Sequence, residues 1–148
     1  MTGCWWKTAA AVVTAFVSAG CVLGPGQTDE GSDIVSQLKI SIPKSATDII
    51  GNTDRGIQFM LPNDQWPGYV DEYYPGATLQ QFPAREMDGS APLECLPALR
   101  SGTKLVVWST GADIQFADTD KHAFRSVSVT PDCISGKTLV QWQLGDLE

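Results

Sequence analysis

Hydrophobic and polar residues alternate along several short segments of the chain, which is the pattern of β-strands with one buried face. The alternating segments are 37–42 (QLKISI), 57–61 (IQFML), 125–130 (RSVSVT) and 138–144 (TLVQWQL). An apolar run at 105–108 (LVVW) suits a central strand, and 114–116 predicts a further short strand. Residues 131–137 are rich in turn formers and predict a hairpin connection between the last two alternating segments.

Residues 63–74 (NDQWPGYVDEYY) are the best candidate for a helix. An asparagine or aspartate at the start can cap the first turn, where Pro67 is also tolerated. At helical spacing, Trp66, Val70 and Tyr73 share one face of this segment. A Pro-Gly pair then ends it.

The remaining segments predict loops. Residues 45–54 indicate turns, and 75–104 indicate irregular structure with at most a helical turn near 96–100. Together, these patterns predict one small α+β domain over residues 37–148. It consists of a mostly antiparallel sheet of about five strands with one short helix packed on a face.

The first 20 residues have the pattern of an export signal. Lys7 gives a positive start, and residues 8–18 (TAAAVVTAFVS) carry no charge. This apolar stretch is shorter than the ~20 residues that span a membrane, but it has the length of a signal-peptide core.

Small residues precede Cys21, whose thiol can accept a diacylglyceryl group. Ala19, Gly20 and Cys21 match the last three positions of the lipobox, so the leader resembles that of bacterial lipoproteins. Ser18 departs from the motif, in which the family usually has an aliphatic residue. The resemblance implies cleavage after Gly20 and acyl chains on Cys21 that hold the protein at the extracytoplasmic face of a cell membrane. The alternatives are an ordinary secretory signal with a nearby cysteine, an uncleaved membrane anchor and a coincidental buried helix.

Composition and charge narrow the possible partners of the mature chain. Residues 22–36 (VLGPGQTDEGSDIVS) lack periodicity and predict a flexible tether of about 20 Å. The whole chain of 148 residues has 10 Lys+Arg, 17 Asp+Glu and a net charge of -7, which argues against nucleic acid as a partner. An acidic protein is also repelled by an anionic bilayer, so the lipid must provide the attachment.

The cysteines fit an exported protein. Cys4 lies in the leader and Cys21 in the lipobox, which leaves Cys95 and Cys133. In an oxidising compartment these two predict one disulfide. Closing that loop stabilises the fold by roughly 4 kcal/mol on the chain-entropy model. The alternative is a pair of buried free thiols.

Parts of the mature chain are similar to small uncharacterised actinobacterial lipoproteins. The similar stretches are residues 40–48 (ISIPKSATD), 57–62 (IQFMLP) and 126–131 (SVSVTP). The resemblance implies a shared small exported domain and brings no known activity with it.

One group of residues has the composition of a metal site. Asp118, Asp120 and His122 are spaced so that they meet a divalent cation if the segment forms a loop. The alternative is a polar turn between strands, which we favour because Lys121 interrupts the group and the calcium-loop pattern is missing. A triad of His122 with Ser109 or Ser126 lacks the GxSxG turn that would support it.

Aromatic residues gather in the predicted helix and offer a possible binding surface. Trp66, Tyr69, Tyr73 and Tyr74 occupy more than one face of that helix, which predicts that some of the rings are exposed. The alternative is crowding of these rings at a junction between helix and sheet.

Two hypotheses about function follow. The first is a non-enzymatic, lipid-anchored binding module without a cofactor, whose partner is an envelope protein or a cell-wall ligand. A phage-encoded or element-encoded lipoprotein that blocks entry or toxicity is one variety of this class. The second is a small exported metal-dependent hydrolase that uses Asp118, Asp120 and His122. We favour the first hypothesis, because the sequence carries no specific catalytic motif.

Overall fold

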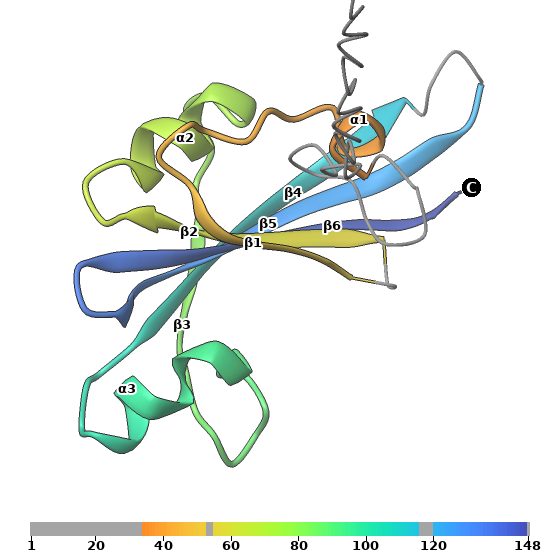
Figure 1. The fold of residues 1–148 in the computed structure, drawn as a ribbon. Helices are drawn as coiled ribbons and strands as arrows, with labels where there is room; N and C mark the ends of the chain where they lie inside the picture. The colour runs from red at the N-terminus through yellow and green to blue at the C-terminus, as the bar shows by residue number, and fades with distance from the viewer. Residues whose placement is uncertain (1–33, 53–54, 116–119, 148) are drawn as a thin grey trace, which may run out of the picture.

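A six-stranded antiparallel sheet runs through the residues that the computed structural model describes, namely 34–52, 55–115 and 120–147 (Figure 1). Its strands are β1 (Thr47–Asn52), β2 (Gly56–Pro62), β3 (Gln80–Pro83), β4 (Val106–Gln115), β5 (His122–Ile134) and β6 (Lys137–Leu147), in the order β1-β2-β6-β5-β4-β3. The helices are α1 (Ile34–Leu38), α2 (Trp66–Tyr73), α3 (Leu96–Arg100) and the short 3₁₀ helix η1 (Leu93–Cys95). The prediction of a mostly antiparallel sheet is confirmed, with more helices than the one expected.

The long C-terminal hairpin follows the predicted alternation most closely. β5 buries Ala123, Arg125, Val127 and Val129 on one face, and its intervening residues point to the other. The strand is longer than the expected 125–130, and the turn to β6 is correspondingly shorter, since Ile134 already pairs with Lys137.

The predicted strand at 37–42 is wrong, because its first two residues end helix α1. Ile34 and Leu38 lie one helical turn apart and are both buried in the core. The helix is closed by two hydrogen bonds, from the backbone N–H of Ile40 to the carbonyl of Val35 and from that of Lys39 to Ser36, with Lys39 at φ 52°. This is the geometry of a Schellman cap, in which a left-handed residue turns the chain away from the helix.

Two further strands lie in segments that the sequence predicts to be turns or irregular. β1 is an edge strand whose alternation is broken by a register shift between Thr47 and Ile50, where Asp48 has φ 53°. β3 is a short edge strand with all four residues exposed. Since neither has a repeating buried face, periodicity gave no signal for them.

The two faces of the sheet are covered unequally. On one face, α1 and α2 pack over the larger core, whereas η1 and α3 cover part of the opposite face (Figure 1). The larger core contains Ile57, Phe59, Leu61, Val127, Val129, Val140, Trp142 and Leu144 from the sheet. The smaller core contains Met60, Ala84, Ala91, Cys95, Leu105, Val107, Cys133 and Leu139.

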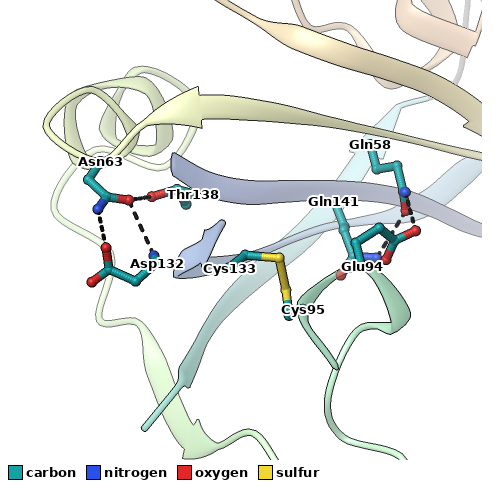
Figure 2. Close-up of a disulfide and its surroundings, with 8 residues drawn as sticks. All are labelled: Gln58, Asn63, Glu94, Cys95, Asp132, Cys133, Thr138 and Gln141. Atoms are coloured by element: carbon teal, nitrogen blue, oxygen red, sulfur yellow. Dashed lines mark hydrogen bonds between the residues drawn. A yellow bond between two sulfur atoms is a disulfide. The ribbon is translucent and has the colours of Figure 1, made fainter. Parts of the chain in front are cut away.

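The predicted disulfide between Cys95 and Cys133 is present and joins η1 to the end of β5 (Figure 2). On one side of it, Gln141 donates to Gln58 (3.2 Å), and Gln58 donates to Glu94 (2.5 Å). These bonds and the disulfide hold η1 and α3 against the sheet.

On the other side of the disulfide, Asn63 holds the turn of the hairpin (Figure 2). Its amide donates to Asp132 (2.5 Å), and its carbonyl accepts from the Thr138 hydroxyl (2.8 Å). Asp132 has φ 57° at the register shift near the end of β5, so this contact stabilises a local conformation that a non-glycine residue rarely adopts.

Several expectations fall on residues outside the described ranges. They are the signal peptide at 1–20, the lipidated Cys21, residues 22–33 of the tether, and Asp118. The last three residues of the predicted tether, 34–36, belong to α1. Within the described part of the chain, each helix is too short or too polar to cross a membrane.

Candidate functional site

The part of the sheet that α3 leaves uncovered presents a continuous row of neutral polar side chains. Residues directly opposite each other in antiparallel strands point to the same face. The register therefore aligns Gln80, Ser109, Ser128, Gln141 and Gln58 across five strands. The next row contains Gly111, Ser126 and Gln143. We call this surface, together with Phe124 and Asp113 beside it, the open face.

Phe124 is the large apolar side chain of the open face. Its exposed fraction is 51%, although Ala123 and Arg125 on either side are buried. A Cβ atom added at Gly111 would lie 2.6 Å from Cζ of the Phe124 ring and 2.9 Å from the carbonyl oxygen of Arg125. The glycine thus leaves the space in which the ring lies against strand β4.

Two hollows of about 400 Å³ each lie on the open face, and Phe124 lines both. The first is lined mainly by hydroxyl and amide side chains: Thr78, Gln80, Ser109, Thr110, Ser126 and Ser128. The second is lined by Asp113, His122 and Asp146. Their volumes fall in the range of small-molecule sites, about 300–1,000 Å³. The ring therefore separates a neutral hollow from one with two carboxylates and an imidazole.

The structure does not assemble the predicted metal site. His122 lies in the second hollow with Asp113 and Asp146, whereas Asp120 does not line that hollow and Asp118 lies outside the described residues. In the described ranges, no three His, Cys, Asp or Glu side chains are grouped so as to hold a metal ion. The sequence identified His122, but only the strand register shows that Asp113 pairs with Phe124 beside it.

The serine triad also finds no support. Ser126 and His122 point to the same face of β5 but are four residues apart, which is about 13 Å along a strand. Ser109 is paired with Ser128, which lies two residues further from His122 along β5 than Ser126 does. A hydrogen bond between the imidazole and either hydroxyl is therefore out of reach.

The structure corrects the expectation that these aromatic rings form an exposed binding surface. Tyr69 and Tyr74 are buried, and Trp66 and Tyr73 are half-buried. Tyr69, Tyr73 and Tyr74 surround Trp142, with ring centroids 5.3–6.1 Å apart. The rings are core, as in the alternative of a crowded junction between helix and sheet, because the helical spacing of Tyr69 and Tyr73 aims both at the sheet.

This aromatic cluster encloses a buried arginine. The guanidinium carbon of Arg125 lies 5.0 Å from the ring centroid of Tyr74, 5.3 Å from that of Trp142 and 5.5 Å from that of Tyr73. Its Nε donates to the Tyr74 hydroxyl (3.1 Å), and its Nη1 donates to the carbonyl of Leu38 (3.0 Å). Among the described residues no carboxylate forms an ion pair with Arg125. Aromatic faces and backbone carbonyls therefore stabilise this buried charge.

Two tyrosine hydroxyls extend the same contact to the segment after α1. Tyr69 donates to the carbonyl of Ser41 (2.9 Å), and the Tyr73 oxygen accepts from the backbone N–H of Ser41 (2.8 Å). Burial, reinforced by the nearby Tyr73, raises the pKa of Tyr69 above its usual value, so its hydroxyl stays protonated and can donate. We call Arg125, Tyr69, Tyr73 and Tyr74 the N-terminal clamp, because they fix residues 38–41 to the core.

Comparisons with known proteins found no protein-family model and no curated protein that matches this chain.

Proposed function

We propose that the protein is a lipid-anchored binding module at the extracytoplasmic face of a cell membrane, and that its binding surface is the open face. One observation carries the second part of this proposal. An exposed ring, Phe124, lies between two hollows whose walls are hydroxyl, amide and carboxylate groups.

An exposed aromatic ring alone would be a weak argument, because single apolar side chains are common on protein surfaces. Here the ring packs at a defined position, since Gly111 leaves the space that the ring occupies. It is also flanked on both sides by groups that form hydrogen bonds. A large apolar surface with a few convergent polar groups is the usual composition of a binding site.

The N-terminal clamp determines on which face of the sheet the proposed tether would reach the domain. The clamp holds residues 38–41 on the face of the sheet that α1 and α2 cover. A tether that runs from a lipidated Cys21 to α1 would join the domain on that face. The open face lies on the opposite side of the sheet from α1 and α2.

The lipid anchor is tested by labelling cells with a fatty-acid analogue. Cys21→Ala should abolish the label, whereas the matched control Cys4→Ala, in the leader, should leave it unchanged. Equal labelling of the wild type and Cys21→Ala would contradict the anchor.

The binding surface is tested with the full-length protein extracted in detergent and mixed with sedimentable cell-envelope fragments. Ser126→Arg places a bulky charged side chain on the open face, and Met87→Arg places the same side chain at a fully exposed position that lines neither hollow. We expect Ser126→Arg to lower cosedimentation and Met87→Arg to leave it unchanged. Equal cosedimentation of Ser126→Arg and the wild type would refute the assignment of the open face.

A further inference from the structure

We propose that the ligand of the open face is a neutral carbohydrate chain, with one sugar ring stacked on Phe124 and its neighbours in the two hollows. This inference rests on the proposed binding role of the open face. It is carried by three properties of that surface: the kind of groups that line it, their charge, and their position in the sheet.

The groups on the open face match the two sides of a sugar ring. A sugar ring has a face of C–H groups and a rim of hydroxyls, and the negative face of an aromatic ring attracts such C–H groups. The exposed ring of Phe124 supplies the aromatic surface. Serine hydroxyls and glutamine amides both donate and accept hydrogen bonds, as sugar hydroxyls do. Ser109, Ser126 and Gln80 offer these groups within the first hollow.

Some of the amides are oriented before any ligand binds. Gln141 donates to Gln58, which in turn donates to Glu94, so this chain of bonds fixes which way each amide points (Figure 2). Ordered polar groups bind more tightly than mobile ones, because less conformational freedom is lost on binding. Gln141 lies next to Ser128 in the register and extends the polar row beyond the first hollow.

The charge of the site favours a neutral ligand. The residues that line the two hollows include Asp113 and Asp146 but no lysine or arginine. Phosphate and carboxylate groups are bound by arginine and lysine, and carboxylates repel them. Anionic glycans and lipid headgroups therefore fit this surface poorly.

The position of Phe124 disfavours an extended peptide. A peptide that adds to a sheet pairs with the free backbone of an edge strand. β4 pairs with β3 only over residues 106–109, but Phe124 lies on β5, which is paired with β4 on one side and with β6 on the other. Recognition at this point must use side chains, which is how the open face presents its hydroxyl and amide groups.

The experiment measures binding of the full-length, detergent-extracted protein to hexasaccharides of glucose, mannose, galactose and N-acetylglucosamine by calorimetry. Oligogalacturonate and an unstructured neutral peptide serve as anionic and peptide probes. We expect at least one neutral hexasaccharide to bind and neither comparison probe to do so. Phe124→Ala should weaken this binding by about three- to tenfold, which is the usual contribution of an aromatic contact, and Phe124→Tyr should restore it.

One control variant and one further test variant complete the experiment. Met87→Ala removes an exposed apolar side chain elsewhere and should bind as the wild type does. Gln80→Ala lies on the exposed edge strand β3, so it tests the first hollow without disturbing the core. The proposal is overturned if no neutral hexasaccharide binds, or if both Phe124→Ala and Gln80→Ala bind as the wild type does. Binding of the peptide probe instead would assign the open face to a protein partner.

The outcome is distinguishable from a failure of the proposed function. If Ser126→Arg reduces cosedimentation with the envelope but no hexasaccharide binds, the open face is a binding surface for another class of ligand. If Ser126→Arg has no effect on cosedimentation, the binding surface itself is misassigned.

Discussion

Removing the disulfide should destabilise the domain by an amount that its loop length sets. Cys95 and Cys133 are separated by 38 residues. For a loop of this size, the chain-entropy model gives about 4 kcal/mol of stabilisation at 25 °C. A small domain has only about 5–15 kcal/mol of stability in total, so this is a large share of it. We therefore expect the double variant Cys95→Ala/Cys133→Ala to unfold at a Tm about 15 °C lower than the wild type.

The structure also predicts which part of the domain loses most stability when the disulfide is removed. The disulfide joins η1 to β5, beside the smaller core that η1 and α3 cover. Amide hydrogen exchange should therefore rise most in residues 84–104 of the double variant, and less in α2 and the strands of the larger core.

The assay is thermal and urea unfolding of the oxidised wild type, the reduced wild type and the double variant, with Met87→Ala as a control for an exposed substitution. A loss below about 1 kcal/mol would mean that the unfolded chain gains little freedom when the loop opens, contrary to the model used. A uniform rise in hydrogen exchange would contradict the local role of the disulfide.

Three other predictions concern the N-terminal clamp and the packing of Phe124 against Gly111. Arg125→Met should cost about 2–4 kcal/mol in urea unfolding, because the Leu38 carbonyl and the Tyr74 hydroxyl lose their charged donor; an unchanged midpoint would contradict the clamp. Because burial raises the pKa of Tyr69, the unfolded chain loses this proton first, and stability should fall as pH rises above about 10; Tyr69→Phe should make that fall shallower, and an identical slope would refute the assignment. Gly111→Ala should cost about 1–3 kcal/mol in thermal unfolding, because its Cβ would crowd the Phe124 ring and a backbone carbonyl; full stability would show that the ring moves freely.

Strands with a regular buried face were predictable from the sequence. β2 and the C-terminal hairpin bury every second residue against the larger core, so their pattern follows the pleat. The strand prediction for 37–42 was wrong because apolar Leu38 and Ile40 alternate with polar residues there, whereas Ile34 and Leu38 pack into the core as one face of helix α1. Its signal lay in residues before the alternating run.

The open face could not have been predicted from the sequence. Gln58 and Gln141 lie far apart in the chain and become neighbours only through the pairing of β2 with β6. In a single strand, serine and glutamine at alternate positions look like any solvated side of a sheet. Likewise, only the register of β4 and β5 shows that Gly111 lies beside the Phe124 ring.

The aromatic residues show the reverse case. Their concentration in one segment was visible in the sequence, but their environment was not, because Trp142 and Arg125 come from distant strands. Helical spacing of Trp66, Val70 and Tyr73 indicated a shared face, and that face packs against the larger core.

The pairing of β2 with β6 determines the order in which the sheet can be completed. Among the described strands, β1 joins the sheet only through β2, and β2 joins the rest only through β6, where Ile57 pairs with Trp142. A chain that emerges N-terminus first, from a ribosome or through a membrane pore, cannot add the β1–β2 hairpin to the sheet until β6 has also emerged. Such long-range pairing slows folding. If the chain is exported as we propose, its sheet can close only after nearly the whole chain has crossed the membrane.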